Sequence, residues 1–281
     1  MTAATIGRPA RPATALRAPW WRGAGDALRA EWTKFRTVAG PGWLLAAGIA
    51  LTAGVSAIAA NSVTCPRGGC QIDPAKVSLT GIYLGQVIVA IVAVTCVSGE
   101  YSTGMIRLTL TAVPRRWQVL AAKVAVTGAV TLAAGAVTVL ACVLAGRALL
   151  YGHGISPAHG YPALSLASGP ALRAAAGSVL YLALIALLGL GVAAMVRDSA
   201  ASIGIVLGLL FLFPIVTSFV GDAHLQRHLE QISPMTAGMY IQATTNLRSL
   251  PLTPWQGLGV LALWAAGALL AGGLLLRLRD A

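Results

Sequence analysis

Charged side chains are scarce in this chain of 281 residues. Asp, Glu, Lys and Arg together make up 10% of it, against roughly 25% in an average soluble domain. Hydrophobic residues make up 57%, and the mean hydropathy is +0.78. A soluble fold could not remove this much apolar surface from water, so the composition excludes an ordinary soluble protein.

Charge is absent from six apolar blocks, each about the twenty residues that a helix needs to cross a bilayer. The blocks contain no Asp, Glu, Lys, Arg or His, and they cover residues 42–60, 79–98, 124–145, 174–196, 199–220 and 255–276. A charge at mid-bilayer costs about 2.5 to 3.5 kcal/mol on insertion scales, and transporters accept that cost where the charge binds or senses a driving ion. Coupling to an ion gradient within these blocks is therefore not expected.

The blocks predict an all-α integral membrane protein with six transmembrane helices. An even number of spans places both termini on one side. Fourteen of the 20 Lys and Arg residues lie in the two terminal segments and in the loops on that same side. Positive charge is retained on the cytoplasmic side, so both termini are expected there. The net charge of +12 is then a topology signal rather than a nucleic-acid-binding surface.

Several catalytic motifs are missing from the sequence. It has no G-x-x-x-x-G-K-[ST] loop for the phosphates of a nucleotide and no G-x-S-x-G nucleophile elbow. His224 and His228 share the spacing of a zinc protease, but no Glu follows the first of them. We expect neither ATP hydrolysis nor a metal site in this chain.

The segment before the first block divides into two parts. Residues 1–24 predict a flexible basic cytoplasmic tail, and residues 25–40 an interfacial amphipathic helix, followed by the six-span transmembrane domain at 41–281. Leu28, Trp32 and Phe35 recur at helical spacing, and a Trp beside basic residues suits the headgroup layer. An ordinary juxtamembrane linker is the alternative. The candidate interfacial residues are Glu31, Trp32, Lys34, Phe35 and Arg36.

The segment after the second block is the most informative part of the sequence. Glu100 and Gly104 come at the end of that block, a Pro-Arg-Arg sequence at 114–116 follows a short apolar segment, and Lys123 precedes the third block. This arrangement resembles the permease subunits of ABC-2-type ATP-binding-cassette transporters. Residues 31–37 also resemble that family's N-terminal interfacial helix, and residues 277–281 resemble a common ending among its actinobacterial members.

The resemblance implies a short coupling helix in this loop, seated against an ATP-binding partner. The candidate coupling residues are Glu100, Tyr101, Gly104, Arg107, Pro114, Arg115, Arg116 and Lys123. Positive charge retained on the cytoplasmic side, with no coupling role, is the alternative for the arginines. The resemblance further implies a homodimer or paired permease with two ATP-binding subunits, which would hold the ATP and Mg. It also implies export and a place in the bacterial plasma membrane, where lipid is the other partner.

Two other functions remain open from the sequence. A non-transporting membrane scaffold or assembly factor could use the basic loop to dock a cytoplasmic protein. A passive channel is disfavoured, since no block has a polar face. Nothing in the sequence distinguishes a drug, lipid, peptide or polysaccharide as the substrate.

Only four cysteines are present. Cys65 and Cys70 flank a Gly-rich turn on the predicted outer face, where an oxidising environment permits a disulfide; free thiols are the alternative. Cys96 and Cys142 lie in apolar blocks and are expected to be packing residues.

Two further patterns concern packing. Small residues recur every fourth position at 46, 50 and 54, and again at 200, 204 and 208. Such stripes let helices approach closely, and we expect them to pack within the bundle rather than between subunits. In the long loop before the last block, Ser233 and Pro234 predict the start of a helix or re-entrant piece at 233–247.

Overall fold

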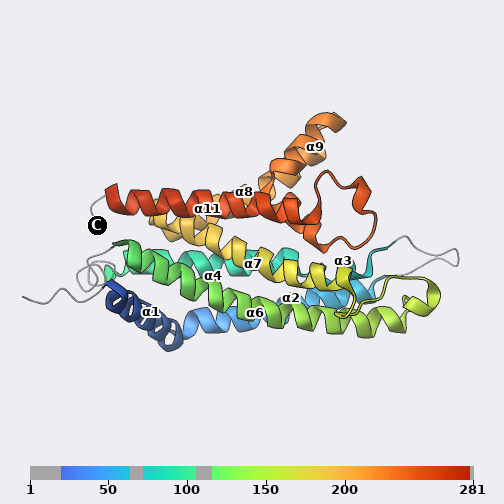
Figure 1. Ribbon diagram of the computed structural model, residues 1–281, viewed down its shortest axis with the longest axis horizontal. Helices are drawn as coiled ribbons and strands as arrows, with labels where there is room; N and C mark the ends of the chain where they lie inside the picture. Colours follow the sequence, from blue (N-terminus) through green and yellow to red (C-terminus); the bar gives the residue numbers. More distant parts are fainter. Residues whose placement is uncertain (1–19, 64–71, 106–115, 279–281) are drawn as a thin grey trace, which may run out of the picture.

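The computed structural model describes residues 20–63, 72–105 and 116–278. Six long apolar helices run along one another in a bundle (Figure 1). They are α2 (Ala39–Asn61), α4 (Ile82–Ser102), α6 (Arg116–Gly152), α7 (Gly169–Val196), α8 (Ser199–Phe219) and α11 (Pro254–Leu278). Each is long and apolar enough to cross a membrane, so the prediction of a six-span, all-α membrane protein is confirmed.

The shorter elements precede or connect the six long helices, and α9 among them projects from the side of the bundle (Figure 1). They are α1 (Trp20–Thr37), α3 (Pro74–Ser78), α9 (Ala223–Ile232), α10 (Pro234–Met239) and the 3-10 turns η1 (Pro157–His159), η2 (Tyr240–Gln242) and η3 (Leu247–Ser249). Figure 1 places α1 and the last turn of α11 at one end, here called the terminal end. The opposite end, where α3 lies, is called the far end.

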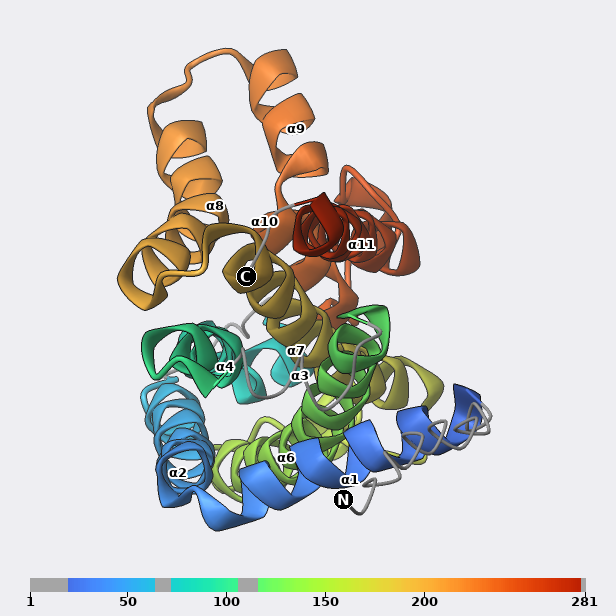
Figure 2. The same ribbon diagram turned by 90° about the vertical axis from the view of Figure 1, so that its left-hand side faces the viewer.

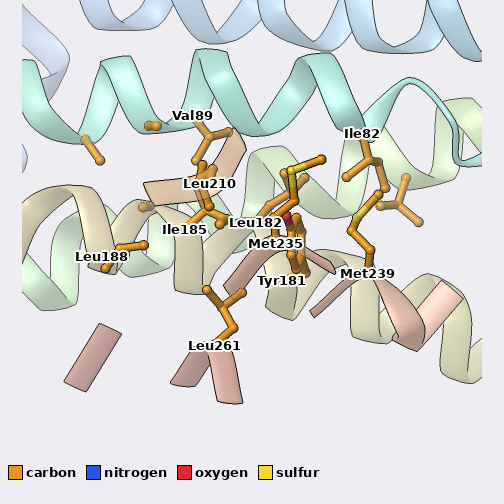
Figure 3. Packing of buried hydrophobic residues seen from close by; sticks show 14 of the residues in the cluster. Ile82, Val89, Tyr181, Leu182, Ile185, Leu188, Leu210, Met235, Met239 and Leu261 are labelled. Atoms are coloured by element: carbon orange, nitrogen blue, oxygen red, sulfur yellow. The ribbon is translucent and has the colours of Figure 1, made fainter. Parts of the chain in front are cut away.

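Helix α7 forms the centre of the bundle. It packs on α4, α6 and α11, and Figure 2, which looks along the bundle, shows it between them. Its Tyr181, Leu182 and Ile185 are almost wholly buried and form the apolar core with residues of the neighbouring helices (Figure 3). Lipid tails are as apolar as this core, so helix association in a membrane depends on close packing rather than on the hydrophobic effect.

Glycine provides part of that close packing. A Cβ added at Gly191 of α7 would lie 2.6 Å from the carbonyl carbon of Ala268 on α11. The two helices therefore meet at a distance that only glycine permits. A similar approach joins α2 to the start of α4, because a Cβ at Gly81 would lie 2.0 Å from the carbonyl oxygen of Thr52.

Helix α6 is longer than its apolar block. The sequence places a span at 124–145, whereas the helix runs from Arg116 to Gly152, about 55 Å at 1.5 Å per residue. Good helix formers continue the chain at both ends, so the helix does not stop where the apolar block stops. As a result Lys123 lies inside a helix rather than in a loop.

The tight turn between α7 and α8 has a clear local cause. Arg197 adopts a left-handed conformation with φ +65° and ends α7. The Asp198 side chain then accepts a hydrogen bond from the Ala201 N–H at 2.7 Å, which caps the first turn of α8.

The small-residue stripes face outward, which corrects the expectation that they pack within the bundle. Residues 46, 50 and 54 of α2 and 200, 204 and 208 of α8 are all exposed. A Cβ added at Gly54, Gly204 or Gly208 would meet nothing within 4 Å. The bundle gets its close contacts from other glycines, and none of the described residues covers these two stripes.

The expected helix at 233–247 is divided. Ser233 caps its start, since its hydroxyl accepts from the Thr236 N–H at 3.1 Å, but α10 ends at Met239 and η2 at Gln242. The N–H groups of Thr244 and Thr245 then bond to a distant side chain, Asp73. These two N–H groups donate to Asp73 and not to a helical carbonyl oxygen, so the helix does not continue to residue 247.

Candidate functional site

One face of α1 directs charged side chains into the protein. Ala27, Glu31 and Lys34 recur at spacings of four and three residues, which places them on one helical face. That face packs on the bundle: Ala27 is 4% exposed and Glu31 9%, and α1 lies against α6. The apolar Leu28 and Trp32 are exposed instead.

Two ends of membrane-spanning helices meet this face. Glu100 lies in the last turn of α4 and Lys123 in the second turn of α6, and both are buried. Glu31, Lys34, Glu100 and Lys123 thus come together from three helices at the terminal end. They are called the charge cluster below.

The charge cluster alternates carboxylates and ammonium groups. Lys123 Nζ lies 2.9 Å from Glu31 Oε2 and 2.6 Å from Glu100 Oε1. Lys34 Nζ lies 3.0 Å from Glu31 Oε1 and 2.8 Å from the same Glu100 oxygen. Lys123 also donates to the carbonyl oxygen of Cys96 at 3.4 Å. Each carboxylate therefore contacts both lysines, and the formal charges sum to zero.

This neutrality explains how Glu31, Glu100 and Lys123 can be buried together beside the half-buried Lys34. Removing one partner from a buried pair leaves an uncompensated charge and costs about 3 to 5 kcal/mol. Burial opposes the charge on Lys34 and so works to lower its pKa, but the hydrogen bond that Lys34 donates to Glu100 and the negative charge of Glu31 outweigh it. The pKa of Lys34 is raised above its usual 10.5. The two carboxylates therefore favour the charged form of Lys34.

The end of α4 makes two further contacts, both toward α8. The guanidinium of Arg197 lies over the ring of Tyr101 at 5.3 Å, a cation–π geometry. The Ser199 hydroxyl donates to that of Ser98 at 2.7 Å. Together with the charge cluster, these contacts tie the end of α4 to α1, to α6 and to the turn between α7 and α8.

Gly104 marks the point where the chain leaves α4. Its φ is +70°, a value that glycine adopts without strain, and Thr103 caps the helix just before it. Gly104 is exposed, and a Cβ there would meet nothing within 4 Å. The chain re-enters the described structure at Arg116, the first residue of α6.

Several predicted site residues lie outside the described part of the chain. These are Arg107, Pro114 and Arg115 of the loop, together with Cys65 and Cys70. The side chain of Arg116 is also outside it. Their predicted roles remain predictions.

The structure joins two groups of residues that the sequence assigned to separate roles. Glu31 and Lys34 of the predicted interfacial helix meet Glu100 and Lys123 of the predicted coupling loop. Trp32, Phe35 and Arg36 are not part of the charge cluster; Trp32 and Arg36 are exposed and Phe35 is half-buried.

The partners of Glu100 are the finding that sequence reasoning missed. We expected this carboxylate to meet a separate protein, but both lysines that bind it belong to this chain. A signal was available in the sequence, because Glu100 and Lys123 stand alone at the edges of apolar blocks, where each needs an opposite charge.

The histidines on α9 do not form a larger site in the described structure. The rings of His224 and His228 lie 4.5 Å apart, edge to face. Within residues 20–63, 72–105 and 116–278, no group of three His, Cys, Asp or Glu residues could hold a metal ion.

A comparison with known protein families gives a match over the greater part of the chain. A family model described as "ABC-2 family transporter protein" matches residues 71–281. The match includes Glu100 and Lys123, whereas Glu31 and Lys34 lie before it. No curated protein matches the chain.

Proposed function

The chain belongs to the ABC-2 family of transporter proteins, and from this premise we propose how it works as a membrane permease subunit. It binds a separate ATP-binding subunit, which holds the ATP and Mg, and it exports its substrate across a bacterial plasma membrane. The loop at residues 102–116 receives the movement of that subunit. The charge cluster passes the movement to the spans.

The charge cluster is the observation that carries this mechanism. The loop leaves α4 at Gly104 and returns at Arg116, so its two ends are the ends of two spans. Glu100 and Lys123, one near each end of the loop, bind each other at 2.6 Å and share Glu31 and Lys34 of α1. A force on the loop therefore acts on α1, α4 and α6 together, because separating them breaks buried ion pairs.

The positions of charge in the spans support an external energy source. In α6 no Asp, Glu, Lys, Arg or His lies between Lys123 and Arg147. The apolar blocks of the other five spans also carry none. A proton- or sodium-coupled carrier places such groups inside the membrane. Energy that enters at one end, through the loop, needs no ionisable group at mid-bilayer.

The proposed topology puts the terminal end in the cytoplasm. The sequence assigns 14 of the 20 Lys and Arg residues to the two terminal segments and to the loops on their side, as the positive-inside rule requires. Figure 2 shows α1 lying across the bundle there. Its exposed Leu28 and Trp32 suit the boundary between headgroups and acyl chains, so we place α1 in the inner headgroup layer.

The exposed small-residue stripes support a dimer. Those on α2 and α8 lie on faces that nothing in the described structure covers. Small residues allow close approach between transmembrane helices. We place the contact with a second permease chain on these two faces.

The test of the proposed function is purification of the full-length chain, tagged, from its native membrane. We expect an ATP-binding protein with a phosphate-cradling loop to co-purify, and the complex to hydrolyse ATP. Replacing the Lys of the partner's phosphate loop should abolish the hydrolysis, and the chain alone should show none. If no ATP-binding protein co-purifies under conditions that keep the chain folded, the scaffold alternative replaces this proposal.

A further inference from the structure

A buried segment enters the far end of the bundle. Residues 234–245, called the capping segment, comprise α10, η2 and the three residues that follow. Its apolar Met235, Ala237, Met239, Ile241 and Ala243 are all buried, although it belongs to a loop between two spans. The segment packs on α7 and α11, and Figure 3 shows Met235 and Met239 beside Tyr181.

The seat of the capping segment is closely fitted. A Cβ at Gly257 of α11 would lie 2.0 Å from the carbonyl oxygen of Ala237. A Cβ at Gly177 of α7 would lie 1.9 Å from Ile241 Cγ1. The segment thus fits only because glycine lines both of its walls.

Polar groups lie beneath and within the capping segment. The Tyr181 hydroxyl donates to Gln86 Oε1, and Gln86 Nε2 lies 3.5 Å from Met235 Sδ. Gln242 is 1% exposed, and its Nε2 has no hydrogen-bond partner among the described residues. An unpaired buried donor disfavours the closed position, so the closed segment needs an attachment that offsets this cost.

Asp73 provides such an attachment. Its carboxylate accepts the Thr244 hydroxyl at 2.6 Å, the Thr245 N–H at 3.1 Å and the Thr244 N–H. The same side chain caps α3, accepting from the N–H groups of Ala75 and Lys76 at 3.1 and 3.3 Å. One carboxylate therefore links the capping segment to α3, across 171 residues of sequence.

A second attachment lies beside the first. Arg173, near the start of α7, donates to the carbonyl oxygen of Ala243. The last residues of the capping segment are thus held from two helices, while its first residues depend on apolar packing and on the Ser233 cap. Both attachments use an ionised group, and such hydrogen bonds are about twice as strong as neutral ones. Asp73 accepts several bonds from Thr244 and Thr245, whereas Arg173 donates to the carbonyl oxygen of Ala243, so the Asp73 attachment is the larger of the two.

We propose that Asp73 is a latch residue, whose hydrogen bonds to Thr244 and Thr245 hold the capping segment closed over the polar interior around Gln86 and Tyr181. Asp73 acts by positioning this segment and touches no substrate. The hydrogen bonds of Asp73 to the capping segment are a feature of the structure. That the capping segment opens to release an exported substrate rests on the proposed function.

The test measures how fast a thiol inside the capping segment becomes accessible. The reporter is Gln242→Cys in a full-length chain whose four native cysteines are replaced by Ala, held in lipid nanodiscs so that both faces are open to reagent. The probe is a charged methanethiosulfonate, which does not enter lipid. Asp73→Asn keeps the cap of α3, because Asn is as good an N-cap as Asp, but it replaces a charged acceptor by an amide.

The matched pair is Thr244→Val against Thr244→Ser. Val has the shape of Thr without the hydroxyl, whereas Ser keeps the donor to Asp73. We expect Asp73→Asn to raise the labelling rate about tenfold, since a bond to a charged acceptor shifts a local opening equilibrium by that order. Thr244→Val should raise the rate less, and Thr244→Ser and the exposed control Arg248→Ala should leave it unchanged.

Three results would overturn the latch. The first is unchanged labelling in both Asp73→Asn and Thr244→Val. The second is equal labelling of the Val and Ser variants at 244, which would make the hydroxyl irrelevant. The third is a rise in every variant including Arg248→Ala, which would show general loosening. Should Asp73→Asn fail to fold, the pair at Thr244 still decides. Since no ATP-binding partner is present, the result does not depend on the proposed function.

Discussion

Lys123 is the more deeply buried of the two lysines in the charge cluster. It binds Glu31 and Glu100 and also donates to the Cys96 carbonyl. Its side chain is 6% exposed, against 28% for Lys34. The two lysines share the same carboxylates but differ in burial, which makes them a matched pair for mutation.

Replacing Lys123 should destabilise the protein far more than replacing Lys34. Lys123→Met leaves two buried carboxylates with only Lys34, and we expect a loss of about 3 to 5 kcal/mol. Lys34→Met should cost less, since water reaches that side chain. Thermal unfolding of the purified chain in one detergent compares the two.

A double variant tests whether the interaction is mutual. In Lys123→Met with Glu100→Gln, the carboxylate that lost its partner is gone, so the double variant should be more stable than the sum of the single effects predicts. Strict additivity would mean that the two residues do not interact, against the geometry described above.

Lys34 gives the charge cluster a defined pH dependence. Its pKa is raised in the folded protein above the usual 10.5, so its stabilising contribution is fully present below that pH and is lost as the pH rises through the raised value. The difference in melting temperature between wild type and Lys34→Met should stay constant from about pH 8 to about pH 10 and shrink above 10.5. A difference that stays constant beyond pH 10.5, or that shrinks below it, would remove Lys34 from the ion pairs.

At the residue scale, the sequence did not predict which side chains meet. Glu31 and Lys34 were singled out as part of an interfacial helix, and Glu100 and Lys123 as part of a coupling loop. Their convergence was not predictable, since it depends on which face of α1 packs on α6. Helical periodicity alone favours burial of Leu28 and Trp32, whereas the structure buries Ala27 and Glu31.

Hydropathy predicts that the six spans exist, but it does not predict where every helix begins and ends. The six spans are predictable, because about twenty apolar residues match the thickness of a bilayer. The ends of α6 are not, since hydropathy reports contact with lipid and not the end of a helix. The division of 233–247 into α10 and η2 was also hidden, because it depends on Asp73, which is distant in the sequence.

The seat of the capping segment allows a prediction at the element scale. Gly257→Ala places a methyl group against the Ala237 carbonyl oxygen, a backbone atom that cannot rotate away. Overpacking of this kind costs about 1 to 3 kcal/mol. We expect a lower melting temperature and faster labelling of the reporter Gln242→Cys.

Gly259→Ala is the control for that change. It lies on the same helix, where an added Cβ meets nothing within 4 Å, so it should leave both measurements unchanged. Equal behaviour of the two alanine variants would show that the capping segment does not rest on α11 as described.

For the whole molecule, the structure separates two regions with different tasks. The charge cluster joins α1, α4 and α6 at the terminal end. At the far end, the capping segment closes the bundle and is held there by Asp73. Apolar spans with α7 at their centre connect the two. In the proposed transporter, movement enters at the first region and opens the second.

The fold class and the family were accessible from the sequence at this scale. Six apolar blocks predict the bundle, and the residues around Glu100 and Gly104 indicate the family that the match over residues 71–281 shows. The sequence did not predict that the stripes at 46–54 and 200–208 face outward. Four-residue spacing is the same whether the neighbouring helix belongs to the same chain or to another.

The central claim is that the loop at 102–116 couples an ATP-binding subunit to the spans, and substitution at Gly104 tests it most directly. Glu100 is unsuitable as the first target, because its replacement would also break the charge cluster. Gly104 is exposed and has φ +70°, which a β-branched residue resists at about 1 to 2 kcal/mol. Asn tolerates that conformation, so Gly104→Val and Gly104→Asn form a matched pair, with Arg248→Ala as a control at the far end.

The decisive measurement is ATP hydrolysis by the complex of the full chain with its ATP-binding subunit, reconstituted in lipid, together with the amount of that subunit retained by each variant. We predict that Gly104→Val folds as wild type does but loses about tenfold in hydrolysis or in bound partner, the factor that 1.4 kcal/mol produces. Gly104→Asn and Arg248→Ala should match wild type. Wild-type partner binding and hydrolysis in Gly104→Val would contradict the account.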